Sequence, residues 1–232
     1  GYRLATNGDW LFSIFQSDKI ESYDIQNKTT GTYPTVDTLD FGNSEFFYWQ
    51  VPTLYNDYLM SWGSYNDGSL TNDGFIHDVS TPSNLGNTLT GKFDCASSFR
   101  YEVGTSDASV NGVVVGHEAG YDIHDISDPT SPTLLHRNTS LDGNDEFVRK
   151  VVYEHPYAYL FVFGNSFVGS ATTSNKSRIW CLDLTDRSNP ETLYDKDTRQ
   201  NDSDMAYVDN SLLLFDGYTE KADASSYTPQ IN

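Results

Sequence analysis

The feature that most constrains the fold of this chain is a short unit that recurs along it. In each copy an aspartate follows an apolar stretch and precedes an aliphatic residue and a turn rich in Pro, Ser, Thr and Asn. The clearest copy reads YDIHDISDPTSPTLL, at residues 121–135. The four aspartates, at intervals of 54, 47 and 58 residues, are Asp24, Asp78, Asp125 and Asp183. These intervals are close to the roughly 40–50 residues of a propeller blade, so the pattern predicts repeated supersecondary units.

Each unit contains further stretches that are typical of strands. A turn and a strongly apolar stretch precede each aspartate, as in VNGVVVGH and HPYAYLFVFG, and a fifth copy reads VDNSLLLFDG. An alternating stretch such as EFVRKVVYE comes before it, and a polar one such as PTLLHRNT follows the aspartate turn. Four antiparallel strands, with the second most apolar and the fourth most polar, are typical of a propeller blade. No segment keeps a 3.6-residue apolar period over three turns, so almost no helix is expected.

The pattern therefore predicts an all-β fold, a β-propeller of four-stranded antiparallel blades. About four and a half blades are expected, with approximate bounds 1–42, 43–94, 95–143, 144–199 and an incomplete 200–232. A fifth apolar strand is present, but a fifth aspartate strand does not follow it. Because a propeller closes by packing its first blade against its last, we expect these blades to belong to a ring of six to eight.

The aspartate units resemble a known family. The segments IHDISDPTSPTLL and LDLTDRSNPETL are similar to the LVIVD repeat of bacterial and archaeal surface β-propellers, in which an aliphatic strand runs into Asp-Val/Ile-Ser/Thr-Asp-Pro-x-x-Pro. The matching residues of the first segment are Asp125, Ile126, Ser127, Asp128, Pro129 and Pro132. In the second segment Arg187 replaces the first proline, and the units at Asp78 and Asp24 match at fewer positions. The resemblance, which extends to anchored extracellular proteins, implies surface display and binding more than a reaction.

Charge and composition limit the classes of partner. The chain has 14 Lys and Arg against 33 Asp and Glu, a formal net charge of −19. This balance argues against nucleic acid and against binding of an anionic membrane by charge, and it favours solubility and tolerance of salt. No apolar run approaches the roughly 20 residues of a transmembrane helix. The first residues lack the features of a signal peptide, so we expect a removed leader or a longer precursor.

The repeated aspartates have two interpretations. They could form a ring of carboxylates that binds cations, or each could accept hydrogen bonds from backbone N–H groups of the turn that follows. The second interpretation explains why every copy is followed by small polar residues and turn formers. We therefore predict a structural role for all four.

Two other groups of side chains could bind a metal ion. A hairpin turning at Ala119-Gly120 would place His117 opposite Asp122, which gives part of a metal site. His124 is expected to be a repeat position, because His77 precedes the aspartate of the previous unit. Asp142 and Asp145 lie in an oxygen-rich segment, but it lacks the ligand order of a dedicated calcium loop. No cofactor and no metal ion are expected, and calcium is the weak alternative.

Several surface features are compatible with an extracellular protein. Four Asn-x-Ser/Thr sequons, a number expected by chance, occur at Asn27, Asn138, Asn175 and Asn201. Two loops, GSYNDGSLTNDG at 63–74 and GNSFVGSATTSNKS at 164–177, are longer than hairpins require, and binding tends to reside in such loops. Cys95 and Cys181 are too few for a disulfide scaffold, and two buried free thiols are expected.

The sequence thus predicts an extracellular or surface-displayed module that binds proteins or assembles with itself, as a subunit of a surface layer or filament. The alternative is a propeller hydrolase or lyase with a carboxylate or metal site in the central channel. No Gly-x-Ser-x-Gly, Walker or His-Glu-x-x-His motif is present, although a site assembled from several blades would leave no such signature.

Overall fold

The structure is a computed structural model that describes residues 3–15, 19–27, 35–40, 45–46, 52–66, 70–85, 90–94, 103–141, 146–164, 177–197, 202–208 and 211–216. These residues form nineteen β-strands. One turn of 3-10 helix, η2 (Ala108–Val110), is the only helical element in the described ranges. The prediction of an all-β chain is therefore confirmed.

The strands form four antiparallel sheets and a two-stranded ribbon. Sheet 1 contains β1 (Arg3–Thr6), β2 (Trp10–Phe15), β3 (Lys19–Asp24) and β4 (Thr35–Asp40). Sheet 2 contains β5 (Glu45–Phe46), β6 (Thr53–Tyr55), β7 (Tyr58–Asn66), β8 (Leu70–Asp78) and β9 (Gly91–Asp94). Sheet 3 contains β10 (Val103–Asp107), β11 (Gly112–Gly116), β12 (Tyr121–Asp125) and β13 (Thr133–Asn138). Sheet 4 contains β14 (Glu146–Glu154), β15 (Tyr157–Gly164), β16 (Arg178–Asp183) and β17 (Glu191–Asp197). The ribbon consists of β18 (Asp202–Val208) and β19 (Ser211–Asp216).

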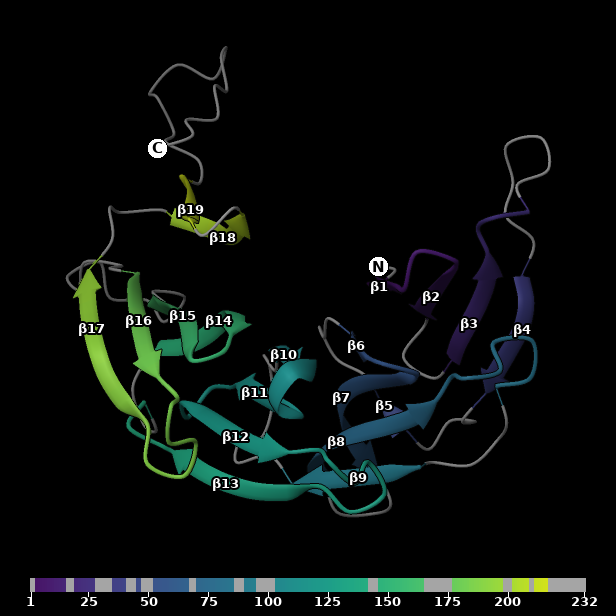
Figure 1. The fold of residues 1–232 in the computed structure, drawn as a ribbon, viewed down its shortest axis with the longest axis horizontal. Helices are drawn as coiled ribbons and strands as arrows, with labels where there is room; N and C mark the ends of the chain where they lie inside the picture. The colour runs from purple at the N-terminus through teal and green to yellow at the C-terminus, as the bar shows by residue number, and fades with distance from the viewer. Residues whose placement is uncertain are drawn as a thin grey trace, which may run out of the picture.

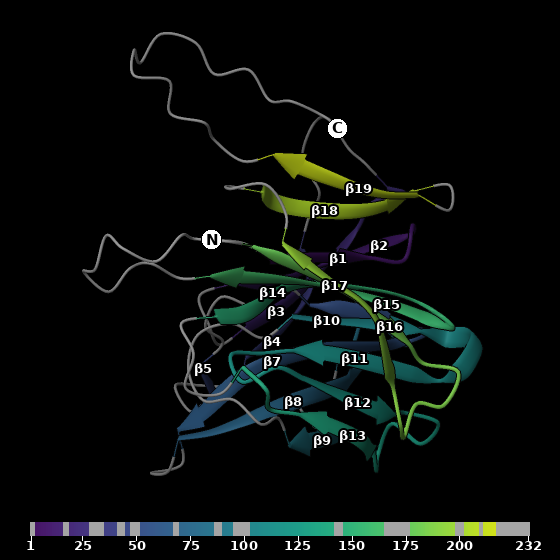
Figure 2. The same cartoon turned by 90° about the vertical axis from the view of Figure 1, so that its left-hand side faces the viewer.

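The sheets follow one another around an arc, which is the arrangement of β-propeller blades (Figure 1). The first strands, β1, β6, β10 and β14, lie on the inside of the arc and contact one another in that order. The last strands, β4, β9, β13 and β17, lie on the outside (Figure 1). Figure 2 shows β18 and β19 next to sheet 4, where β18 contacts β14. The chain adopts a β-propeller fold, and in each sheet the successive strands lie progressively farther from the inside of the arc.

Alternation within the second strands explains how the sheets stack. Successive side chains of a strand point to opposite faces, so an apolar strand can pack against a sheet on each side. In β11, Val113 and Val115 face sheet 2, and Val114 between them faces sheet 4. All five residues of β11 are buried, whereas the first two residues of β13 are exposed. The most apolar strand is thus enclosed on both faces, and the most polar strand lies at the rim.

Three apolar clusters hold the sheets together. The 1–2 cluster contains Phe12, Ile14 and Ile20 of sheet 1 with Leu59, Phe75, Val79 and Leu85. The 2–3 cluster contains Tyr55, Met60 and Ile76 with Val113, Val115 and Ile126. The 3–4 cluster joins Val114, Tyr121, Ile123 and Leu141 to Val148, Val151, Tyr153, Ala158, Leu160, Val162, Trp180, Leu182 and Leu184. Each cluster removes from water a face that a single sheet would leave exposed, which is the main stabilising contribution in such a stack.

Register irregularities recur at equivalent positions. In sheets 1, 3 and 4 the pairing of the third and fourth strands shifts one or two residues before the repeat aspartate, for example between Ile123 and His124. The β18–β19 ribbon also repeats the register of β14–β15, including a shift at the same place in the first strand. These bulges bend the strand and increase its twist. The repeat is therefore present in the backbone pairing as well as in the sequence.

The second sheet departs from the four-strand pattern. Where the other sheets have one first strand, the described residues of this sheet form two short strands, β5 and β6, which both pair with β7. Pro52 lies directly before β6, and proline has no backbone N–H to donate to a ladder. No helix among the described residues is long and apolar enough to cross a membrane.

Cys181 lies in the third strand of sheet 4, where it is half-buried with a free thiol. Burial raises the pKa of this thiol above its ordinary value, which keeps it in the less reactive thiol form. Cys95 lies outside the described residues, so the expectation for that thiol stays a prediction.

Candidate functional site

The four repeat aspartates end the third strand of their sheets and hold the turns that follow. Asp24, Asp78, Asp125 and Asp183 each pair with the first residue of the second strand. In every copy one carboxylate oxygen, Oδ1, accepts a hydrogen bond from the backbone N–H two residues later, at 2.8–3.0 Å. Hydrogen bonds from Thr185 lower the pKa of Asp183, and the same kind of contact from Asn27 lowers the pKa of Asp24. The carboxylates thus stabilise the turns in their charged form.

A second set of contacts ties these turns to the rest of the sheet. The residue after each aspartate donates its N–H to the carbonyl of the residue before the second strand, as from Ile126 to Asn111 and from Leu184 to Pro156. Arg187, which replaces the first proline of its unit, reaches back to sheet 3, and its Nη2 lies 3.0 Å from Asp125 Oδ2. The repeat aspartate of sheet 3, Asp125, therefore also binds the turn of sheet 4.

We expect Asp78→Ala to destabilise the protein by about 1 kcal/mol, because the backbone N–H of Ser80 loses its acceptor. Asp78→Asn keeps an oxygen at the Oδ1 position and should lower the free energy of unfolding by clearly less than Asp78→Ala does. Urea unfolding of the two variants measures the difference. Equal destabilisation by both substitutions would show that charge, and not the turn hydrogen bond, is what the position requires.

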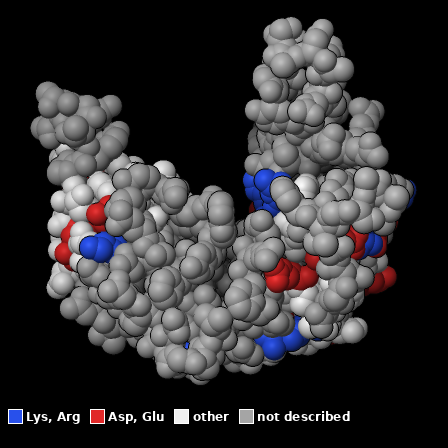
Figure 3. Space-filling view, turned by 180° about the vertical axis from the view of Figure 1, so that it is seen from behind, with Lys and Arg blue, Asp and Glu red and all other residues white. Residues whose placement is uncertain are grey.

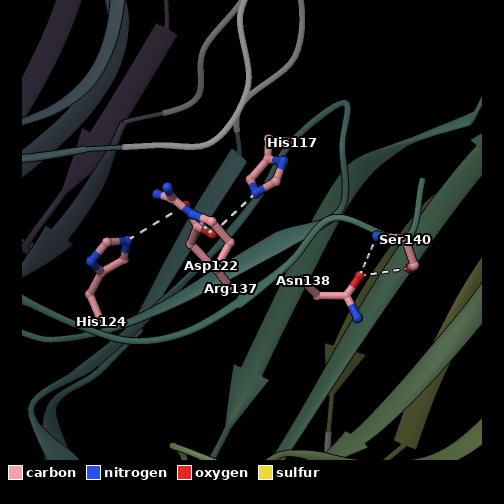
Figure 4. A network of polar contacts seen from close by, with 6 residues as sticks. All are labelled: His117, Asp122, His124, Arg137, Asn138 and Ser140. Carbon is pink, nitrogen blue, oxygen red and sulfur yellow. Dashed lines mark hydrogen bonds and ion pairs between the residues drawn. The ribbon is translucent and has the colours of Figure 1, made fainter. Parts of the chain in front are cut away.

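Among the described residues, a buried polar group lies toward the end of sheet 3 opposite its aspartate turn, near the turn between β11 and β12. It is formed by His117, Asp122, His124 and Arg137 (Figure 4). The backbone of His117 exchanges hydrogen bonds with Gly120 across the turn, at 2.9 and 3.3 Å. Gly120 has a φ of 149°, and a Cβ there would overlap the carbonyl oxygen of Asn138, so the turn requires glycine. This tight turn brings His117 beside the first residues of β12.

Asp122 is the centre of this group. It is fully buried, and it is the acceptor for both arms of the Arg137 guanidinium, with Nε–Oδ1 and Nη2–Oδ2 distances of 2.9 Å. The Nε2 atoms of His117 and His124 lie 3.4 Å and 4.0 Å from its two oxygens. Figure 4 shows the two imidazoles directed toward the carboxylate from different sides. Two-armed pairing of this kind is among the strongest ionic contacts in proteins.

The electrostatics of the group favour a charged Asp122. Burial acts to raise the pKa of Asp122, but contacts with His117 and Arg137 outweigh that effect, and its pKa lies below the ordinary value. A buried carboxylate costs several kcal/mol unless it is paired, and Arg137 provides the pair. The arrangement is therefore a closed ion pair flanked by two imidazoles.

This geometry does not make a metal site. The Arg137 guanidinium occupies both oxygens of Asp122, and its positive charge would repel a cation. Across the described ranges, no group of three or more His, Cys, Asp or Glu side chains is placed to hold a metal ion. The structure thus brings His117 and Asp122 together as the hairpin suggested, and also brings His124 to them. Asp142 and Asp145, the weak calcium candidates, lie outside the described residues.

Sequence reasoning missed Arg137, the residue that balances Asp122. Arg137 is 15 positions later in the chain, on β13, and it pairs with Asp122 in the strand register. The signal that could have found it is the acid inside an otherwise apolar strand, since a buried carboxylate requires a base on a neighbouring strand. The next strand offers two bases, His136 and Arg137, so this signal narrows the partner to these two residues.

The structure describes only parts of the two long segments expected to be loops, 63–74 and 164–177. The hairpin of β7 and β8 continues past the position where β11 and β12 end, with four additional residue pairs from Gly63–Asp73 to Asn66–Leu70. It projects from the same end of the sheets as the His117 turn, opposite the aspartate turns. The tip of this hairpin and most of the loop at 164–177 lie outside the described residues.

The sequons show no common environment. Asn27 is exposed and its side-chain amide donates to Asp24 Oδ2 at 2.5 Å. Asn138 is half-buried, and its Oδ1 accepts hydrogen bonds from the N–H and hydroxyl of Ser140. Asn175 and Asn201 lie outside the described residues. Glycosylation of these positions stays a prediction.

No protein-family model and no curated protein matches the sequence. Among solved structures, the chain is similar to a Bombyx mori GH32 β-fructofuranosidase, a mutant solved in complex with sucrose. The TM-score is 0.47 and the sequence identity 11%, and the similarity covers 91% of this chain and 53% of the enzyme. The chain therefore spans about half the length of that protein, and a likeness at this level transfers no activity to it.

Proposed function

We propose that this chain is an extracellular or surface-displayed β-propeller module of the LVIVD type, which binds protein partners or further copies of itself. In the self-binding case it serves as a subunit of a surface layer or filament. The resemblance of its aspartate turns to that repeat supports the location at the surface, and the structural use of those aspartates supports binding in preference to catalysis.

The observation that supports the proposal most is the projecting β7–β8 hairpin. Its four additional residue pairs extend beyond the level of the β11–β12 turn. An extended hairpin on a rigid stack of sheets presents backbone and side chains without disturbing the core, and binding loops are commonly placed this way. The strand ends that flank the segment 165–176, in β15 and β16, lie at the same end of their sheet.

The use of the polar groups is consistent with this role. The repeat aspartates bind backbone N–H groups of their turns, and Asp122 is paired with Arg137 in the interior. On the face in Figure 3, acidic and basic side chains lie next to one another where residues are described, so neither sign dominates that part of the surface. A mixed polar surface of this kind suits the rim of a protein interface.

The test removes the hairpin and measures association. Residues 64–72 are replaced by Asn-Gly, which closes Gly63 and Asp73 with a two-residue turn. Sedimentation velocity over a concentration series should show assemblies for the full chain and weaker assembly for the shortened chain. The shortened chain also loses the pairing of β5 with Ser64 and Tyr65, so the control is unchanged hydrogen-exchange protection of β11 and β15, which shows that the stack of sheets stays intact.

Two results would count against the proposal. If the full and the shortened chain associate equally, the hairpin does not contribute to the interface. A full chain that stays monomeric at every concentration, and that hydrolyses ester or glycoside probes, would favour the enzyme alternative.

A further inference from the structure

Two departures from the repeat meet at the interface between sheets 3 and 4. The first residue of the second strand is aromatic in sheets 1, 2 and 4, where it is Trp10, Tyr58 and Tyr157. Sheet 3 has Gly112 at this place. In the turn after β16, Arg187 stands where the repeat has its first proline. The first departure removes a side chain, and the second adds a charged one.

Gly112 leaves room for two side chains of sheet 4. It lies two residues before Val114 on β11, so a side chain there would point toward sheet 4 as Val114 does. A Cβ at Gly112 would lie 2.9 Å from Arg187 Nη1 and 3.0 Å from Tyr153 Oη. An aromatic side chain, as in the other sheets, would need the space that both groups occupy. The glycine therefore allows a guanidinium and a phenol to approach one point between the sheets.

Both groups are hydrogen-bond donors that lack a protein acceptor. Tyr153 is 4% exposed, and neither its Oη nor the enclosed Nη1 of Arg187 has a hydrogen-bond partner among the described residues. Burial raises the pKa of Tyr153 to about 12, so the phenol keeps its proton and remains a donor. Arginine stays charged in proteins. Because a buried donor without an acceptor is costly, these two donors point to a ligand with an oxygen or another acceptor atom.

The charges around the two donors limit what this ligand can be. Nη2 of Arg187 lies 3.0 Å from Asp125 Oδ2, so a carboxylate already balances the guanidinium. Gly112 pairs with Asp125 on one side and with Asp107 on the other, and Asp107 also acts to raise the pKa of Tyr153. These two carboxylates would repel an anion. A cation would meet two donors, one of them positively charged. The acceptor that fits is therefore a neutral oxygen.

We propose that the point beside Gly112 is a binding site for one water molecule, which accepts hydrogen bonds from Tyr153 Oη and Arg187 Nη1 and donates to a carboxylate at the same interface. Both donor atoms lie within 3.0 Å of one point, so a single oxygen can reach them at ordinary hydrogen-bond distances. Larger hydroxyl ligands such as glycerol are excluded, because both donor atoms are enclosed. Buried waters make about three hydrogen bonds each, which is the number that this site offers. The water links the aspartate turn of sheet 4 to β14 and to sheet 3.

A crystal structure of the full chain, at a resolution that shows ordered waters, tests the proposal directly. We expect an oxygen within about 3.2 Å of both Tyr153 Oη and Arg187 Nη1. Crystals soaked in sodium bromide distinguish water from a halide, because bromide is located by its anomalous scattering, and no bromide should occupy the site. Bromide there would overturn the proposal. A direct hydrogen bond between the two side chains, or from either of them to another protein atom, would overturn it as well.

A double-mutant cycle tests the site in solution. Arg187→Pro restores the residue of the repeat and removes one donor, and Tyr153→Phe removes the other. Because one water serves both donors, the fall in the thermal unfolding midpoint of the double variant should be smaller than the two single falls added together. Arg187→Met removes the same donor without restricting the backbone, and it should give the same result.

Arg178→Met is the matched control for this cycle. Arg178 is also an arginine of sheet 4, but its guanidinium contacts Glu146 and Asp195 at the other end of the strand. Its effect should therefore add to that of Tyr153→Phe. Simple addition in the Arg187 pairs as well would overturn the proposal, because the two donors would then share no ligand.

Discussion

Arg137→Met is expected to lower the free energy of unfolding by about 3 kcal/mol, because the fully buried carboxylate of Asp122 loses the guanidinium that pairs with it. The value is at the lower end for a buried ion pair, since the Arg137 side chain is 29% exposed. Urea unfolding at neutral pH measures it. The variant should also raise the pKa of Asp122 toward the value for a buried carboxyl, which NMR titration would detect.

The paired variant Asp122→Leu with Arg137→Met separates the charge effect from packing. Replacing both partners of a buried pair by apolar side chains is often nearly neutral, so the double variant should recover most of the lost stability. Arg178→Met is the control on a pair whose carboxylates are more exposed: Arg178 contacts Glu146 at 2.5 Å and Asp195 at 3.1 Å, and these two acidic side chains are 29% and 41% exposed, against 0% for Asp122. It should cost about 1 kcal/mol or less. A double variant as unstable as the single one would contradict the role assigned to Arg137.

Acid should weaken the same ion pair. The native pKa of Asp122 is lowered, so its contribution to stability is present above the unfolded pKa of about 3.9 and is lost as the pH falls through the native value. The lowered pKa of His77 makes the free energy of unfolding fall over a higher pH range, as the pH drops from about 6.5 to about 4. The two contributions can therefore be separated by pH in one titration.

The fold could be predicted from the sequence because its periodicities are strong. The apolar run of β11 and the aspartate before each turn are local patterns, and both recur in four units, although the turns after Asp24 and Asp78 match the repeat at fewer positions. Sheets of this kind must bury both faces, so repetition of the unit already implies stacking around an axis. The same reasoning did not foresee that two short strands, β5 and β6, would both pair with β7 in sheet 2.

Counting residues along the two strands could not have identified Arg137 as the cross-strand neighbour of Asp122, for a specific reason. Asp125 pairs with Thr133 and His124 with Leu134, so regular pairing would place Asp122 opposite His136. The bulge between Ile123 and His124 shifts the register by one residue and places Arg137 there instead. A shift of one residue moves every later side chain to the other face. Charge pairing across a sheet therefore depends on bulges that the sequence pattern does not indicate.

Gly91→Ala is expected to destabilise the protein by about 3 kcal/mol or more, because the added methyl group has no room between sheets 2 and 3. A Cβ at Gly91 would overlap the carbonyl oxygen of Pro129, and it would lie 3.0 Å from the carbonyl carbon of Pro129 and 3.3 Å from Thr130 Cα. These are backbone atoms of the aspartate turn after β12, so no side-chain rotation relieves the overlap. The turn must move away from β9, and the packing of Ile76 against Ile126 would be lost with it.

Gly116→Ala is the comparison variant, because the added Cβ would overlap side-chain atoms there, whereas at Gly91 it would overlap backbone atoms. Its Cβ would overlap Val148 Cγ1, and it would lie 2.8 Å from Val148 Cβ and 2.9 Å from Val151 Cγ2. Adding Val148→Ala removes the overlapping methyl group, so the double variant should recover part of the loss, whereas no substitution in sheet 3 should rescue Gly91→Ala in this way. Thermal unfolding of the single and double variants measures both. If Gly91→Ala is as stable as the unmodified chain, the third sheet does not approach the second as closely as the aspartate turn requires, and the stacking of these two sheets must be revised.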